Sequence, residues 1–116
     1  ADVALAGGAS MMIEATRALV AVDVNTGADT SPAAGLKACI AAARELPRQL
    51  RLRGLGGQVV IDFAPCPKKN RHVLEQTLRK AFRDGVETTL AGWTPLGNFE
   101  LQRRRDRQPL VQWMAQ

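Results

Sequence analysis

The sequence is poor in aromatic residues, which make up 4% of its 116 residues, and it has no tyrosine and a single histidine, His72. No serine or cysteine has a histidine partner that the sequence suggests, which argues against a nucleophilic triad. His72 follows Arg71 at an expected helix start, where a solvated side chain is a better interpretation than a general base. With so few aromatic residues, we expect Trp93 to fill the core rather than to stack on a base.

Cysteine is equally sparse, and long apolar runs are missing. Cys39 and Cys66 lie far apart, show no CxxC spacing and have no nearby histidine, so we expect neither zinc nor a disulfide framework. No apolar run approaches the roughly 20 residues that span a bilayer, and no basic-then-apolar leader begins the chain. We therefore expect a soluble, cytoplasmic protein with no membrane partner.

An apolar fraction of 46% is enough for one hydrophobic core, so we expect residues 1–116 to form a single domain, as a piece of a longer protein. Charge divides the chain unevenly. Residues 1–34 contain four acids and one base, whereas residues 35–116 contain fifteen bases and seven acids. The resulting pI of about 10.0 fits a nucleic-acid partner, although basic domains that bind membranes or acidic proteins share it.

Apolar periodicity predicts an α/β fold, a mixed β-sheet with packed helices in the order β-β-α-β-α-β-β. Ser31 and Pro32 are typical of a helix N-cap and first turn, and "GLGG" reads as a helix stop. Pro47 is the discordant residue of the first helix, since an internal proline costs about 3 kcal/mol unless a kink absorbs it. No element is assigned to the C-terminal tail. The expected elements are a β-hairpin over residues 9–25, a helix over 32–52, a strand over 58–63, a helix over 70–84, and strands over 86–93 and 99–104.

Two carboxylates close apolar strands, Asp23 in "VAVDVN" and Asp62 in "VVIDF". If these strands are neighbours, the two side chains converge, and their repulsion is relieved by a shared proton or a bound cation. Carboxylate and amide oxygens with water suit Mg²⁺, or Mn²⁺ in its place. Asp23 would then bind the ion, and Asn25, one strand period later, would orient a water or a phosphate oxygen. A turn-forming or helix-capping role stays open for each Asp.

Three stretches carry a resemblance to a known family: "VAVDVNTG", "ARELPRQLRLRGLGGQVVIDF" and "TPLGNFELQRRR". Between Gly7 and Arg105 the chain resembles the catalytic core segment of the ribonuclease E/G family, called the DNase I-like subdomain. The resemblance implies that Asp23 and Asp62 coordinate a catalytic Mg²⁺ and that Asn25 assists by hydrogen bonding. It also implies endonucleolytic cleavage of single-stranded RNA, with water as the nucleophile and 5′-phosphate ends as products.

The chain departs from the family pattern in several places. "APCP" follows "IDF" where the family commonly has another Asp, "CIAAA" replaces "NLEAA", and "GVET" replaces basic residues after the second helix. None of these changes touches Asp23 or Asp62. An isolated segment should bind RNA weakly and cleave it slowly or not at all.

Charge and spacing add a hypothesis about RNA contacts. We expect six arginines to attract the RNA backbone: Arg48, Arg51, Arg53, Arg103, Arg104 and Arg105. Two rival functions stay open, a catalytically idle RNA-binding or scaffold module of the same fold, and hydrolysis of another phosphoester such as DNA. Homo-oligomerisation of the full-length protein is open as well.

Overall fold

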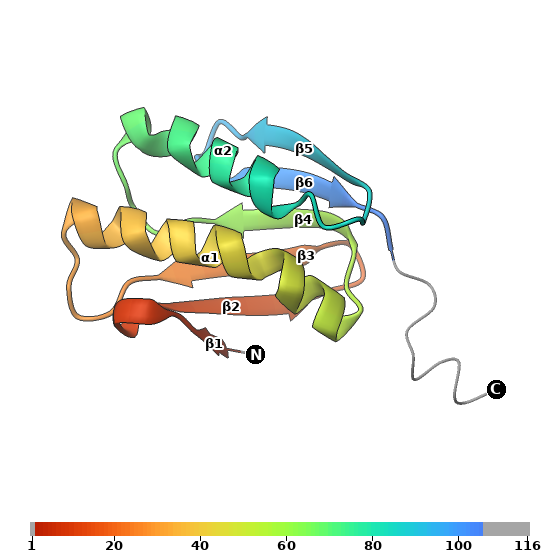
Figure 1. Cartoon of the computed structure of the whole chain (residues 1–116), viewed down its shortest axis with the longest axis horizontal. Helices are drawn as coiled ribbons and strands as arrows, with labels where there is room; N and C mark the ends of the chain where they lie inside the picture. The colour runs from red at the N-terminus through yellow and green to blue at the C-terminus, as the bar shows by residue number, and fades with distance from the viewer. Residues whose placement is uncertain (1, 106–116) are drawn as a thin grey trace.

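A six-stranded mixed sheet carries both helices on one of its faces (Figure 1). The structure, a computed structural model, describes residues 2–105, and the C-terminal tail lies outside the described residues from residue 106 on. The sheet has the order β1-β2-β3-β4-β6-β5. Only β3 and β4 pair in parallel, and every other neighbouring pair is antiparallel. Its elements are β1 (Asp2–Ala4), β2 (Ser10–Ala15), β3 (Val20–Asn25), α1 (Pro32–Arg53), β4 (Gly57–Asp62), α2 (Arg71–Ala81), β5 (Thr88–Trp93) and β6 (Phe99–Arg103).

The mixed α/β order predicted from the sequence is confirmed, with small differences. The chain adds β1, which pairs with β2, and two 3₁₀ turns, η1 (Ala6–Gly8) and η2 (Lys68–Asn70). The second helix is shorter than its apolar spacing predicts and ends at Ala81. Among the described residues, no helix combines the length and apolar composition needed to cross a membrane.

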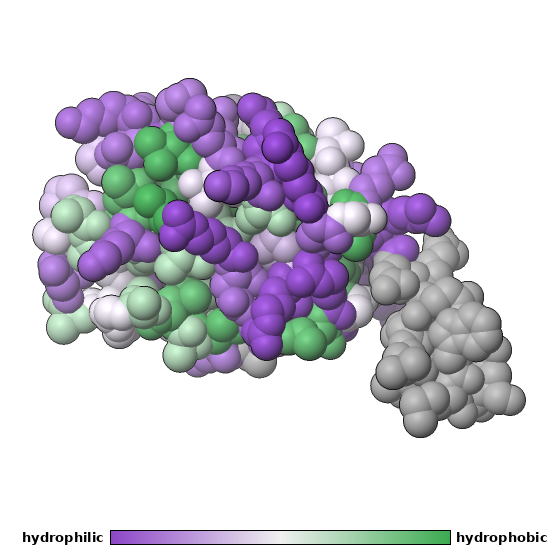
Figure 2. All heavy atoms as spheres, viewed as in Figure 1, coloured by the Kyte–Doolittle hydropathy of each residue, from purple (hydrophilic) through white to green (hydrophobic). Residues whose placement is uncertain are grey.

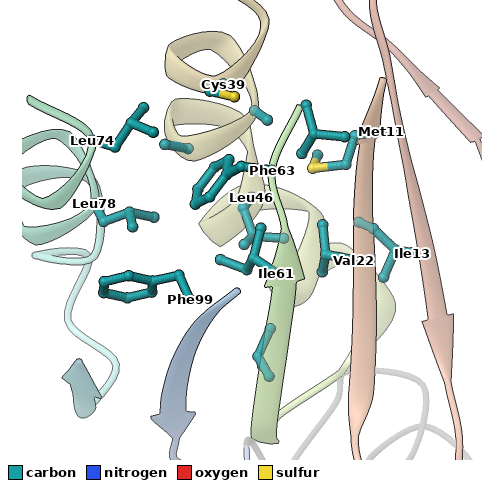
Figure 3. Packing of buried hydrophobic residues seen from close by; sticks show 14 of the residues in the cluster. Met11, Ile13, Val22, Cys39, Leu46, Ile61, Phe63, Leu74, Leu78 and Phe99 are labelled. Carbon is teal, nitrogen blue, oxygen red and sulfur yellow. The ribbon is translucent and has the colours of Figure 1, made fainter. Parts of the chain in front are cut away.

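The core lies between the sheet and the helices (Figure 3). Strand positions alternate, so that Val22 and Val24 of β3 are buried while Asp23 and Asn25 are exposed, as expected for a sheet covered on one side only. Leu46 of α1 and Leu74 and Leu78 of α2 pack down onto Ile61 and Phe99 from above the sheet. Within residues 2–105, the opposite face of the sheet carries no helix.

Helix α1 begins and ends as its sequence indicates. The hydroxyl of Ser31 accepts a hydrogen bond from the Ala34 N–H at 3.2 Å, and Gly54 ends the helix in the left-handed conformation with φ of 63°. Pro47 lies inside the helix, buried, and the helix continues through it to Arg53. The chain thus accommodates the cost of an internal proline, about 3 kcal/mol in a typical helix, without ending α1.

Small residues bring α1 close to the loop that follows β4. A Cβ at Gly35 would lie only 2.1 Å from the backbone oxygen of Pro65, and the Cys39 thiol donates a hydrogen bond to the Ala64 carbonyl at 3.3 Å. Both contacts fix the segment directly after Asp62. The glycine at position 35 is therefore required by the packing of a loop that leaves the strand end.

We predict that Gly35→Ala destabilises the protein. Helix propensity alone favours this change by about 1 kcal/mol, whereas the missing space for a Cβ predicts a loss of about 1–3 kcal/mol. Urea unfolding followed by circular dichroism measures the change in the free energy of unfolding and its sign. A more stable variant would contradict the close approach of α1 to Pro65.

Candidate metal centre at the ends of two parallel strands

Asp23 and Asp62 lie opposite each other in the parallel pair formed by β3 and β4. Neighbouring strands are about 4.8 Å apart, and both residues occupy exposed positions that alternate with buried ones. The two carboxylates therefore stand on the same helix-free face, at the carboxyl ends of their strands. The sequence predicts that the two side chains converge if their strands are neighbours, and β3 and β4 are neighbours in the sheet.

Asn25 lies one strand period beyond Asp23 on the same face. Its side-chain amide donates a hydrogen bond to Oδ2 of Asp23 at 3.4 Å. This long contact holds the two side chains side by side at the strand end. The amide is therefore placed to orient the carboxylate, or an oxygen that approaches it.

The oxygen donors fit a hard cation that keeps part of its water shell. Among residues 2–105, no group of three or more His, Cys, Asp or Glu side chains is arranged to hold a metal. Mg²⁺ is commonly bound through one or two carboxylates, with waters and substrate phosphates as the other ligands. Two carboxylates with a neighbouring amide meet that pattern, whereas a fully protein-coordinated ion would need more ligands.

The helix-free face, which we call the open face, is acidic around this pair. Its strand positions that bear charge are all carboxylates, and none of the described strand residues on it is a lysine or arginine. These charged positions are Asp2, Glu14, Asp23, Asp62 and Glu100. A phosphate group approaching Asp23 and Asp62 would thus meet negative charge, which a bound divalent cation would offset.

The two cysteines take no part in this pair. Both are free thiols. Burial of Cys39, with smaller contributions from the neighbouring Cys66, raises the pKa of its thiol to about 12. Cys39 is therefore protonated at neutral pH and is unsuited to act as a nucleophile.

The arginines predicted to contact RNA lie at the other end of the sheet. Gly57, the first residue of β4, pairs with Arg103, so about 17 Å of strand separates this end from Asp62. Helix α1 also ends there, at the right of Figure 1. The carboxylates and these six arginines, which the sequence predicts to act on one RNA, thus lie at opposite ends of the sheet.

Two of these arginines form a structural ion pair with Asp84. Arg103, whose side chain is only 2% exposed, donates from Nη2 to the Asp84 carboxylate at 2.7 Å, and Arg51 donates to the same carboxylate. Arg103 also lies over the Phe82 ring. Since the guanidinium of Arg103 is buried and paired, it is not part of the RNA contacts that we propose below. Arg48 pairs with Glu45 at 2.9 Å, and Arg53 bonds to Gln49.

Comparison with known proteins adds to this geometry. The family model described as Ribonuclease E/G family matches residues 1–106. The chain belongs to the ribonuclease E/G family. It is 38% identical to Ribonuclease G of Salmonella typhimurium (strain SL1344) over 91% of this chain and 23% of that protein. It is 37% identical to Ribonuclease E of Escherichia coli (strain K12), over 90% of this chain and 10% of that protein.

A plant relative shows the same relation. The Ribonuclease E/G-like protein, chloroplastic, of Arabidopsis thaliana is 35% identical over 97% of this chain and 12% of that protein. The chain thus spans less than a quarter of the length of these relatives. Family membership, predicted from three short stretches of sequence, is confirmed along nearly the whole chain.

Three basic residues that no sequence prediction singled out lie at the same edge as Asp62. Lys68, Lys69 and Arg71 belong to η2 and the start of α2, which the fold places beside the carboxyl ends of β3 and β4, at the left of Figure 1. Their signal was present as a run of bases six to nine residues after Asp62. The prediction of RNA contacts was based on the longer arginine runs elsewhere in the sequence.

We predict that Asp84→Asn lowers the free energy of unfolding by about 3 kcal/mol at neutral pH, because it leaves the buried Arg103 without its counter-ion. Burial raises the pKa of Asp84, but hydrogen bonds from Arg103 and Arg51 outweigh it and hold the pKa below its usual value. A lowered folded-state pKa stabilises the protein above about pH 4 and ceases to do so as the pH falls further.

The difference in the free energy of unfolding between the parent and Asp84→Asn should therefore be largest near pH 7 and shrink as the pH falls below about 4. Urea titrations at several pH values measure it. Glu87→Gln, a change at an exposed neighbouring carboxylate, serves as the control and should cost less than about 0.5 kcal/mol. A loss in Asp84→Asn that is the same at pH 3 and pH 7 would contradict this assignment.

Proposed function

We propose that this chain is the catalytic segment of a longer, metal-dependent endoribonuclease that cleaves single-stranded RNA and leaves 5′-phosphate ends. The observation that carries the proposal is the register that sets Asp23 opposite Asp62 at the carboxyl ends of two parallel strands. Membership of a family whose members are named Ribonuclease G and Ribonuclease E supports it. The basic composition of the chain agrees with an RNA substrate.

In this proposal Asp23 and Asp62 hold Mg²⁺, or Mn²⁺ in its place. The ion would supply the activation of a water molecule and the neutralisation of charge on the scissile phosphate. Asn25 keeps the Asp23 carboxylate in place through its hydrogen bond. Hydrolysis adds the water oxygen to phosphorus and breaks the bond to the 3′ oxygen, so that the products end in a 5′-phosphate and a 3′-hydroxyl.

The packing around Asp62 supports its role as a fixed ligand. Phe63, the next residue, is buried and lies against Trp93 with ring centroids 5.8 Å apart. The following residue, Ala64, accepts the hydrogen bond from Cys39. Two anchors directly after the strand thus restrict the backbone at Asp62, which lowers the entropy lost when the carboxylate binds an ion.

We predict that Asp23→Asn and Asp62→Asn each abolish metal binding and lower cleavage at least about 100-fold, since metal-ion catalysis supplies several kcal/mol. The measurements are calorimetric titration with Mg²⁺ and Mn²⁺ and cleavage of a single-stranded RNA by the full-length protein. Both exposed positions tolerate an amide, so folding should be unchanged.

Glu14→Gln is the matched control. Glu14 lies on the same open face, on the neighbouring strand β2 opposite Ala21, so the change removes one negative charge without touching either proposed ligand. It should bind metal and cleave RNA as the parent does. Cleavage by Asp23→Asn at the parent rate would overturn the ligand assignment. RNA binding with no cleavage by the parent, at any metal concentration, would instead favour a catalytically idle RNA-binding module.

The same assay with DNA and a small phosphodiester tests the substrate class. The proposal expects cleavage of RNA alone at a measurable rate. Equal rates on DNA would leave the metal centre in place and overturn the assignment to RNA.

A further inference from the structure

The edge of the sheet that bears Asp62 carries unpaired positive charge. Between Asp62 and Glu75 the sequence holds three bases and no acid. Lys68 and Lys69 are exposed, and none of the described acidic side chains forms an ion pair with Lys68, Lys69 or Arg71. Arg48, Arg51 and Arg103, at the opposite end of the sheet, all have carboxylate partners.

Arg71 is held in place without a carboxylate. Its guanidinium carbon lies 4.7 Å from the centre of the Trp93 ring, and its Nη2 would lie only 3.2 Å from a Cβ at Gly97. The guanidinium is therefore confined between an aromatic ring and the backbone of the turn between β5 and β6. A guanidinium that lies over an aromatic ring still has N–H donors at its edge, and these suit a phosphate.

Trp93 connects this guanidinium to the metal centre. Its ring contacts Phe63, which directly follows Asp62, and it meets Phe99 edge-on with centroids 5.3 Å apart. The contacts of Trp93 with Phe63 and Phe99 agree with the prediction that it fills the core, and Arg71 lies over its ring. The positions of Arg71 and of the Asp62 backbone depend on the same aromatic cluster.

The turn between β5 and β6 adds an apolar residue at this edge. Leu96 is 92% exposed and precedes Gly97, against which Arg71 lies. Since β5 runs in the same direction as β4, this turn stands at the same edge as Asp62. A fully exposed leucine beside free cations offers an apolar contact for an unstacked base, as single-stranded nucleic acids present.

We propose that these residues, Lys68, Lys69, Arg71 and Leu96, form a strand-end corner that holds single-stranded RNA on one side of the scissile phosphate. The cations contact backbone phosphates, Trp93 positions Arg71, and Leu96 packs against a base. The open face is acidic, so an RNA strand gains its attraction from the corner and from the metal ion rather than from the sheet. This inference rests on the proposed function and assigns the RNA contacts that the terminal arginines were expected to make.

The layers of the molecule agree with this path. Figure 2 views the helical side, where hydrophilic side chains cover much of the surface, whereas the charged strand positions of the open face are acidic. The loop from Phe63 to Asn70 crosses from the strand end to the helix layer. In an RNA strand that passes over this edge, one phosphate lies at the metal ion on the open face, and neighbouring phosphates contact lysine and arginine at the corner.

The test compares Arg71→Gln with Arg79→Gln in the full-length protein. Arg79 is exposed on the same helix, about 12 Å further from the edge, so the two variants carry the same net charge. The probe is a labelled single-stranded oligoribonucleotide, bound without divalent metal at several salt concentrations and cleaved with Mg²⁺. Arg71→Gln should weaken binding about fivefold and reduce the slope of log K against log salt by about 0.7, the loss of one phosphate contact.

In cleavage, Arg71→Gln should raise KM about fivefold and leave kcat within about twofold, while Arg79→Gln resembles the parent. Arg71→Lys keeps the charge but loses the flat stack, and should fall between the two. Equal KM values and equal salt slopes for Arg71→Gln and Arg79→Gln would overturn the corner. A thermal unfolding curve shows whether Arg71→Gln has kept its fold.

Leu96→Ala keeps the proposal testable if changes at Arg71 disturb the aromatic cluster. A side chain that is 92% exposed contributes little to folding, so a loss of RNA affinity in this variant reports on contact with RNA. An unchanged affinity in both Leu96→Ala and a Lys68→Gln, Lys69→Gln double variant overturns the corner. RNA binding is measured without metal, so the two proposals fail in different ways. If the metal centre is wrong, the parent protein binds RNA but its cleavage does not depend on Asp23 and Asp62. If the corner is wrong, the corner variants bind RNA as tightly as the parent does.

Discussion

The parallel pairing of β3 with β4 is the constraint on which the rest of the structure depends. Parallel neighbours cannot be joined by a tight turn, so the chain must cross over the sheet between them, and α1 makes that crossing. The crossing returns β4 in the same direction as β3 and sets Asp62 beside Asp23. An antiparallel partner would have placed the two carboxylates at opposite ends of the sheet. The helix layer, the covered core and the pair of carboxylates thus follow from one pairing.

The same constraint explains why the sheet has two different faces. Both helices pack on the side of the sheet on which α1 crosses over. Strand residues are therefore alternately buried and exposed, as in β3. Carboxylates can stand at alternate strand positions because no helix in the described part of the chain covers the other face. The asymmetry extends to charge: the helices and the loop after β4 are basic, while the charged strand positions of the open face are acidic.

Local patterns predicted much of this fold, and pairwise contacts set the rest. Apolar spacing identified both helices, the hairpin of β2 and β3, and the buried strand that ends at Asp62. It extended α2 past Ala81, because Phe82 continues the spacing of apolar residues, whereas in the structure the helix ends there and the chain turns toward β5. It could not show that Arg103 is buried. Arginine runs read as solvated or phosphate-binding, and only the tertiary contact with Asp84 and Phe82 reveals one as a core residue.

The carboxylate pair was predictable because both Asp residues end apolar strands, a local signal that strand pairing turns into proximity. The position of the basic residues near it was not predictable, because the edge of the sheet that a residue reaches depends on the fold and not on how many bases the sequence gathers. The segment with Lys68, Lys69 and Arg71 lies at the edge of the sheet that bears Asp62, whereas the longer arginine runs lie a strand's length away and are partly paired with carboxylates. Position relative to the sheet therefore decides which charges lie near the two carboxylates, and the number of basic residues in the sequence does not.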